Sequence, residues 1–283
     1  MLCINKKKFN NFRTFYDFDA YLYLCSPKKG GIDMPTNHGL LREEEMVYEI
    51  NNKKVCELSN NIRHMFQVLY GVLDDNEIVT AKLTEERMKP DFIISYKGIE
   101  KGISMKSGSS TLVHSEFVDS FITYLKSHGI NDKTIETILL YQFGDGTTDG
   151  SGEKRYEFSE LKYLLSERIK EANEDLNKSV DFIYQVIERC VLQGVNDGWP
   201  RADGLYHGDK SFGVIATEKQ IWKHIHRKDF HWMDALHIGP LILRPSARYV
   251  DKEIMNEKRR HTIQCAWPNL YPDIIYISQR YNS

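Results

Sequence analysis

The sequence predicts an α/β protein with a mixed central β-sheet flanked by helices. Hydrophobic residues make up 41% of the 283 residues, which is enough to bury a sizeable core. Helical and strand periods alternate over residues 41–146 in the order helix, strand, strand, strand, helix, strand. Further helical and strand-like runs follow, so we expect a C-terminal α+β extension on this core.

Each element is predicted from its apolar spacing and its flanking turn residues. Val47, Ile50 and Leu58 recur with a helical period, whereas "EIVTAKLTE" (77–85) is typical of a strand. In the remainder of the core, the spacing predicts a hairpin within 89–108, a helix over 111–130 that ends at Gly129, and a buried strand over 135–146. Later segments predict helices over 157–173, 178–193 and near "TEKQIWKHIH", and strand-like runs over 235–249 and 261–278, with a Gly/Trp/Pro-rich loop before them.

The turn-rich stretch "GDGTTDGSGE" is the best candidate boundary in the chain. We therefore expect a peripheral extension over residues 1–40, a core over 41–150 and a C-terminal region over 151–283 packed on that core. Residues 201–283 hold thirteen Lys/Arg against nine Asp/Glu, so this last region is the one suited to contact a polyanion.

Composition and the absence of certain motifs argue against several classes of protein. The five cysteines are far apart and form no CxxC pair, which excludes the usual zinc frameworks and disfavours a disulfide scaffold. No apolar run approaches ~18 residues, so no membrane span is expected. No Walker loop or GxGxxG is present. These features fit a protein of the reducing cytoplasm.

The stretch "KPDFIISYKGIEKGISMKSG" (89–108) is the most informative part of the sequence. Successive side chains of a strand point to opposite faces. If Gly98 to Lys101 form a four-residue loop, Asp91, Ser104 and Lys106 lie on the same face of the hairpin, with Asp91 diagonal to Lys106. An acid and a lysine on one face, within this order of elements, indicate a catalytic site.

These residues resemble the motif of the PD-(D/E)xK nuclease superfamily, the fold of restriction endonucleases and many repair and recombination nucleases. The resemblance covers about residues 41–146: "PD" is Pro90-Asp91, and Lys106 matches the family's lysine. Ser104 departs from the pattern, since that position is usually Asp or Glu. The resemblance implies a restriction-endonuclease-like core, Mg²⁺ as cofactor, and Asp91, Ser104 and Lys106 in the site.

A Mg²⁺ site needs more hard oxygen ligands than Asp91 alone supplies. Some restriction endonucleases with a Ser-x-Lys triplet carry the missing carboxylate on the following helix, which here would hold Glu116 and Asp119. The family also often uses a glutamate of the first helix, for which Glu49 and then Glu45 are candidates. The alternative for Glu116 is an acid that merely favours a first helical turn, and for Glu49 a solvated face.

The resemblance implies that the metal polarises the scissile phosphate and acidifies a bound water, while Lys106 orients that water and offsets charge. We therefore expect a Mg²⁺-dependent endodeoxyribonuclease of the restriction or defence type. The alternative is an inactive nucleic-acid-binding or protein-interaction module on the same fold. A Ser104–Lys106 nucleophile pair is disfavoured, because no oxyanion-hole motif accompanies it.

Basic residues are interleaved with aromatics near the C-terminus, a pattern that suits phosphate contact with base stacking. The expected nucleic-acid contacts are Arg244, Arg248, Lys258, Arg259 and Arg260. The alternative is a solvated face with Trp267 in the core. The expected partner is DNA rather than a membrane, and a homodimer is compatible with the sequence.

Overall fold

The structure is a computed structural model that describes residues 38–85, 88–152, 155–196, 198–228, 230, 235–246 and 257–281. The chain divides into two compact units, Met1–Asn37 and His38–Ser283, and the first lies outside the described residues. The extension expected over residues 1–40 is therefore almost wholly outside the described part of the chain. Within the described ranges, no helix is long and apolar enough to cross a membrane.

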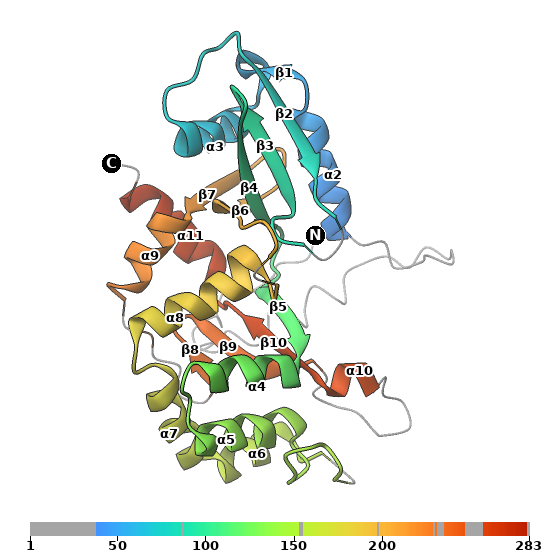
Figure 1. Cartoon of the computed structure of the whole chain (residues 1–283), viewed down its shortest axis with the longest axis vertical. Coiled ribbons are helices and arrows are strands. Elements are labelled where there is room, and N and C mark those ends of the chain that lie inside the picture. Colours follow the sequence, from blue (N-terminus) through green and yellow to red (C-terminus); the bar gives the residue numbers. More distant parts are fainter. Residues whose placement is uncertain are drawn as a thin grey trace, which may run out of the picture. The chain divides into compact units, whose positions relative to one another are not determined.

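A six-stranded mixed sheet forms one half of the described unit (Figure 1). Its order is β1-β2-β3-β4-β6-β7, with β4 and β6 parallel and the other pairs antiparallel. The strands are β1 (Lys53–Lys54), β2 (Ile78–Leu83), β3 (Phe92–Tyr96), β4 (Ile99–Lys106), β6 (Gly204–Gly208) and β7 (Gly213–Thr217). The predicted mixed sheet flanked by helices is confirmed at this level.

Helices α2 (His38–Ile50) and α3 (Asn60–Tyr70) cover one face of this sheet (Figure 1). Met46 and Ile50 are one turn apart on α2 and fully buried, which is the spacing that a helix needs to present an apolar stripe. They pack with alternate residues of the strands, including Phe92 and Ile94 of β3 and Ile103 of β4. This packing fixes α2 against the strands that carry the predicted hairpin.

A second, antiparallel sheet has the order β5-β10-β9-β8. Its strands are β5 (Leu112–Phe117), β8 (His237–Ile238), β9 (Leu241–Pro245) and β10 (Thr262–Ala266). The helices in the rest of the chain are α4 (Val118–Ser127), α5 (Asp132–Phe143), α6 (Phe158–Leu164), α7 (Ser166–Leu176), α8 (Val180–Ile187) with the π-helical turn η2 (Glu188–Gln193), α9 (Glu218–Ile225), α10 (Glu257–Arg260) and α11 (Leu270–Arg280).

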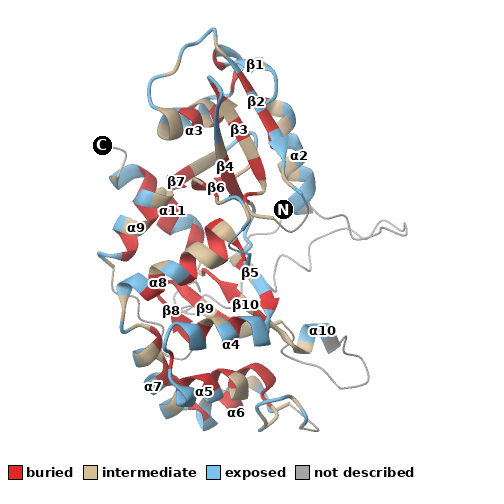
Figure 2. Cartoon of the chain, in the orientation of Figure 1, coloured by how far each residue is buried: buried red, intermediate tan, exposed pale blue. Residues whose placement is uncertain are grey.

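One apolar core joins the second sheet to the other face of the first. Leu205 of β6 and Ala216 of β7 belong to the same buried cluster as Cys265 of β10 and Trp267. Trp267 is fully buried and its Nε1 donates to Asp273 at 2.8 Å, so the alternative that placed Trp267 in the core is confirmed. Figure 2 shows the buried residues concentrated on the strands and on the inner sides of the helices.

Three predicted elements were wholly or partly wrong. The strand-like run predicted over 261–278 is a strand only over Thr262–Ala266 and continues as helix α11, Leu270–Arg280. The predicted helix over 111–130 begins as strand β5 and becomes helical only at Val118. The predicted strand over 135–146 is helix α5, which Asn131 caps by accepting from the Thr134 N–H at 2.8 Å and which Gly144 ends with a φ of 60°. A short apolar run such as "ILLYQF" is compatible with a buried strand or a buried helix, and here the caps decide.

The strand that pairs with β4 comes from a segment predicted as loop. Residues 204–217 form β6 and β7, and both belong to the region expected as the C-terminal extension. Gly213 of β7 is required by packing, because a Cβ there would lie 2.0 Å from the Tyr206 hydroxyl oxygen. Both predicted regions, 41–150 and 151–283, therefore contribute strands to one sheet.

Candidate active site

The hairpin of β3 and β4 has a shorter turn than the expected four-residue loop. Tyr96 pairs with Ile99, so the turn consists of Lys97 and Gly98, with φ values of 50° and 76°. The register therefore shifts along β4 by four residues, and Ser95 faces Glu100 rather than Ser104. Because four is even, the shift leaves every side chain on its predicted face.

Asp91 lies directly before β3 and is fixed to the end of β4. Its N–H donates to the Ile103 carbonyl at 2.8 Å, and its Oδ2 accepts from the Met105 N–H at 2.5 Å. Gly102 allows the close approach, because a Cβ there would lie 2.6 Å from the Pro90 ring. The carboxylate of Asp91 is thereby held beside the residue that precedes Lys106, which brings together the acid and the lysine of the predicted site.

Ser104 and Lys106 follow alternate positions of β4, and both pair with β6. Ser104 pairs with Leu205, and Lys106 with His207, in a parallel register. Ser104 is fully buried, and its hydroxyl has no hydrogen-bond partner among the described residues. Lys106 is half-buried at the strand end. The serine therefore brings an uncharged, enclosed hydroxyl to the position where the motif usually has a carboxylate.

Glu43 of α2 is an acid of this site that the sequence analysis missed. Burial raises the pKa of Glu43 to about 7, and the charge of Asp91 adds to the rise, while Lys106 and then Lys89 oppose it. Two neighbours place this end of α2 at the ends of β4 and β6: a Cβ at Gly108 would lie 3.3 Å from an Arg42 nitrogen. In addition, Glu45 lies 3.8 Å from the Lys210 ammonium.

A signal for Glu43 was present in the sequence. It precedes Met46 by three residues and Ile50 by seven, so it lies on the apolar stripe of the helix and faces the sheet. The sequence analysis instead selected Glu49 and Glu45 from the same helix. Glu49 forms a 2.8 Å ion pair with Lys53, whose hydrogen bond lowers the pKa of Glu49.

Lys89 is a second residue that sequence reasoning missed. Its ammonium donates to the carbonyls of Val113, Cys190 and Val191 at 3.2–3.3 Å. Burial lowers the pKa of Lys89 to about 7, and the positive charge of Lys106 contributes to the fall. Lys89 thus links the segment before Asp91 to β5 and to η2, and its charge acts on the same site.

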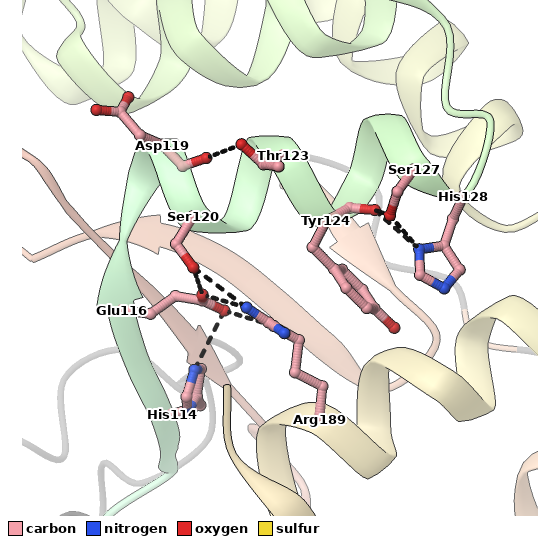
Figure 3. A network of polar contacts seen from close by, with 9 residues as sticks. All are labelled: His114, Glu116, Asp119, Ser120, Thr123, Tyr124, Ser127, His128 and Arg189. Atoms are coloured by element: carbon pink, nitrogen blue, oxygen red, sulfur yellow. Dashed lines mark hydrogen bonds and ion pairs between the residues drawn. The ribbon is translucent and has the colours of Figure 1, made fainter. Parts of the chain in front are cut away.

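Glu116 lies on β5, not on a helix, and belongs to a separate polar network (Figure 3). Arg189 donates to both of its carboxylate oxygens, at 3.0 and 2.7 Å, and the ring of His114 and the hydroxyl of Ser120 lie at 3.2 and 2.8 Å. Burial acts to raise the pKa of Glu116, but the hydrogen bonds from His114 and Arg189 outweigh it and lower the pKa to about 2. Its oxygens are occupied by protein donors.

Asp119 is exposed in the first turn of α4, and its carboxylate points away from this network (Figure 3). Two aromatic residues of this segment differ in their burial. Phe121 is fully buried, but Phe117 belongs to β5 and is 54% exposed. Neither Glu116 nor Asp119 therefore completes the site with Asp91. The acid whose charge interacts with Asp91 is Glu43.

The predicted nucleic-acid contacts differ in their surroundings. Arg260 forms a 2.5 Å ion pair with Asp145, whose side chain is 1% exposed. Arg244 Nε donates to Gln264 at 3.2 Å across the β9–β10 pair. Lys258 and Arg259 are exposed on α10, whereas Arg248 lies outside the described residues. Arg260 therefore has a structural ion pair, and Arg259 is the better candidate for a free phosphate contact.

Glu43, Asp91 and Lys106 together are called the acid–lysine cluster. Two surface depressions lie away from it. One, of about 450 Å³, lies between α3 and α9 and is lined in part by His64, Lys219 and Lys223. The other, of about 430 Å³, lies over Asp119 and Arg189. Over the described ranges, no group of three or more His, Cys, Asp and Glu side chains gathers as a metal site. Any cation at Glu43 and Asp91 would therefore have two protein carboxylates.

Comparison with known proteins adds no family to this description. No protein-family model matches the sequence, and no curated protein matches it with statistical significance. The geometry of the site is therefore the basis on which a function can be inferred.

Proposed function

We propose that the chain is a metal-dependent nuclease that hydrolyses phosphodiester bonds in DNA. The observation that carries this proposal is the hydrogen bond between the Asp91 carboxylate and the Met105 N–H, which holds an acid next to Lys106 at the end of β4. Glu43 approaches the same end of the sheet from α2. Two acids and a lysine at one strand end are the groups that such hydrolysis requires.

The order of elements supports a restriction-endonuclease-like core. Helix α2 precedes three antiparallel strands, β2, β3 and β4. The next helix that packs against this sheet is α8 with η2, since Ala202 of the following segment donates to the Leu192 carbonyl and Leu192 shares a core with Leu205. Parallel strand β6 then closes the order next to β4. In this interpretation the last helix and the last strand of the order come from residues 180–208. The sequence analysis expected them within residues 111–146.

The residues present fit a hydrated divalent cation. The carboxylates of Glu43 and Asp91 repel each other in a partly buried place, and a cation between them would relieve that repulsion. Mg²⁺ is commonly held by one or two carboxylates, with water and substrate phosphate as its other ligands. When bound, the ion would supply Lewis acidity toward the phosphate and a more acidic water.

The protein's own side chains would then divide the remaining work. The Lys106 ammonium extends from the strand end beside Asp91, where it can donate to a phosphate oxygen and offset the charge that grows there. Lys89 holds the carbonyls of η2 and β5 against the segment that carries Asp91, which positions this acid. Ser104 is enclosed and uncharged, so it supplies no anionic ligand.

A nicking and linearisation assay on supercoiled plasmid, with Mg²⁺ titrated and with EDTA as the blank, tests the proposal. Lys106→Ala should lower the cleavage rate by on the order of 100-fold, because it removes charge stabilisation from the transition state. Lys82→Ala is the matched control, since Lys82 is an exposed lysine on β2 of the same sheet. Equal cleavage by wild type and Lys106→Ala would remove the proposal's main support.

A second candidate is a nucleic-acid-binding module on the same fold without catalysis. The observation in its favour is Ser104, which places a hydroxyl where an acid would complete the motif. The same plasmid assay, run beside a gel-shift experiment, distinguishes the two. Binding that does not lead to metal-dependent cleavage by the wild type would select this second candidate.

A further inference from the structure

Three aromatic rings form a ladder at the end of β6. The rings of His207 and Tyr271 have centroids 4.9 Å apart, and those of Tyr271 and Phe212 are 6.3 Å apart at 70°. His207 is buried at the inner end, while Tyr271 is 37% exposed and Phe212 is 56% exposed at the outer end. The outer two rings therefore present aromatic surface to solvent at an angle to each other.

The ladder lies at the same end of the sheet as the acid–lysine cluster. His207 is the register partner of Lys106 in the parallel pair of β4 and β6, and side chains of paired residues share a face. The chain turns directly after Gly208, and Phe212 precedes β7 in that turn. Exposed aromatic surface thus begins one strand away from the lysine that we place at the scissile phosphate.

The turn that carries Phe212 is held firmly. Asp209 Oδ1 accepts from the N–H groups of Ser211 and Phe212 at 2.8 and 3.1 Å. Asn61 of α3 donates to the carbonyls of Asp209 and Lys210 at 3.3 and 3.4 Å. An exposed aromatic ring on a turn fixed in this way loses little entropy when a flat ligand stacks on it.

We infer that this nuclease site takes a strand with an unpaired base beside the scissile phosphate, and that Phe212 and Tyr271 stack on that base. The inference rests on the proposed function and adds its substrate class, which is single-stranded or frayed DNA. Bases within an intact duplex have their faces covered by neighbours, whereas an unpaired base offers a free face to an aromatic side chain. Lys210, exposed in the same turn, suits the adjoining phosphate.

The first experiment measures binding without cleavage. A single-stranded oligonucleotide with 2-aminopurine at successive positions is mixed with the protein in EDTA, and fluorescence reports stacking of that base. The wild type should quench one position strongly and bind the single strand more tightly than the matching blunt duplex. Phe212→Ala should lose the quench and roughly tenfold in affinity for the single strand, with little change for the duplex.

Two further variants keep the result interpretable. Phe212→Trp should retain the quench, because it preserves a flat aromatic face, whereas Phe212→Leu should lose it although it preserves apolar bulk. Tyr163→Ala is the control, since Tyr163 is an exposed aromatic residue on α6. Circular dichroism checks that Tyr271→Ala, made in the same series, is folded.

Each outcome decides at least one of the two proposals. Preference for the blunt duplex, or unchanged affinity and quench in Phe212→Ala, overturns the stacking inference and leaves the nuclease proposal standing. Specific quenching without Mg²⁺-dependent cleavage of any strand supports the stacking surface and overturns the nuclease. A wild type that binds no oligonucleotide overturns both.

Discussion

Asp91 and Met105 are joined side chain to backbone: the carboxylate Oδ2 of the first accepts the N–H of the second at 2.5 Å. This bond does two things at once. It terminates the β3–β4 pairing at a defined point, and it turns the acid toward the strand end where Lys106 follows. Fold and proposed chemistry therefore depend on the same oxygen atom, and substitutions can separate the two.

Asp91→Asn should abolish plasmid cleavage while keeping the fold. The amide oxygen of asparagine can still accept the Met105 N–H, but the negative charge needed by a cation is lost. Asp91→Ala should lose cleavage and also about 1 kcal/mol of stability, since the Met105 N–H loses its partner. Urea denaturation of the two variants makes the comparison. Cleavage by Asp91→Asn at the wild-type rate would show that the charge is not used.

Glu43→Gln should raise the Mg²⁺ concentration needed for half-maximal cleavage, because it removes one of two carboxylates. Glu45→Gln and Glu49→Gln are matched controls on the same helix, and both should cleave as the wild type does. If either control shows the larger change, the assignment of Glu43 from its position on the apolar stripe is wrong.

Glu43→Gln should also be more stable than the wild type at pH 8. The folded pKa of Glu43, about 7, lies above its unfolded value of 4.5, so ionisation costs the folded state progressively as pH rises from about 4.5 to 7. The glutamine variant avoids that cost, and its advantage should vanish near pH 4. Thermal melts of both proteins at the two pH values check the sign. A glutamine variant that is less stable than the wild type at pH 8 would contradict the interpretation that burial disfavours the ionised Glu43 carboxylate in the folded protein.

Glu116 should matter for stability and not for the metal requirement. Its folded pKa of about 2 lies below 4.5, so it contributes stability above pH 4.5 that is lost as the pH falls toward 2. Glu116→Ala leaves Arg189 buried without its partner and should cost about 3 kcal/mol or more. Glu171→Ala removes an exposed partner of Lys133 and should leave the stability almost unchanged. A raised Mg²⁺ requirement in Glu116→Gln would restore it as a ligand.

Arg259 and Arg260 should separate into a contact residue and a structural residue. Arg259→Ala should reduce the slope of log affinity for DNA against log salt by about one, because one fewer counterion is released. Arg260→Ala should instead lower the melting temperature, and Asp145→Asn should do the same, because the two residues form one buried pair. Equal slopes for Arg259→Ala and the wild type would assign Arg259 to a solvated face.

The sequence was most informative where strand alternation was strong. The faces of Asp91, Ser104 and Lys106 could be predicted even with the wrong turn, because an error of four residues preserves parity. Helix α5 could not be told from a strand by its short apolar run, and β6 and β7 were hidden by glycines that make room for Tyr206 and for strand packing. Such glycines are indistinguishable from turn glycines until the neighbouring strand is known.

The charged residues of the site also differ in whether they could be identified from the sequence. Glu43 could have been selected from its spacing to Met46 and Ile50, because an acid on an apolar stripe is the anomalous member of "REEE". Lys89 could not, since the carbonyls that bind it come from residues 113, 190 and 191, which approach only after the chain has folded. Glu116 was assigned to a helix because the spacing over 111–130 was interpreted as helical, and its partner Arg189, 73 residues away, could not be identified from the sequence.

Strands β4 and β6 are neighbours in the sheet, yet residues 107–203 separate them along the chain. On the ribosome, β4 therefore emerges long before the strand that will cover it, and its free edge carries Ile103 and Met105 in the meantime. Parallel pairing across so long a connection is slow. A nascent chain stalled near residue 150 should then be a client for chaperones, and the protein's yield in cells should depend on how quickly translation reaches Gly204.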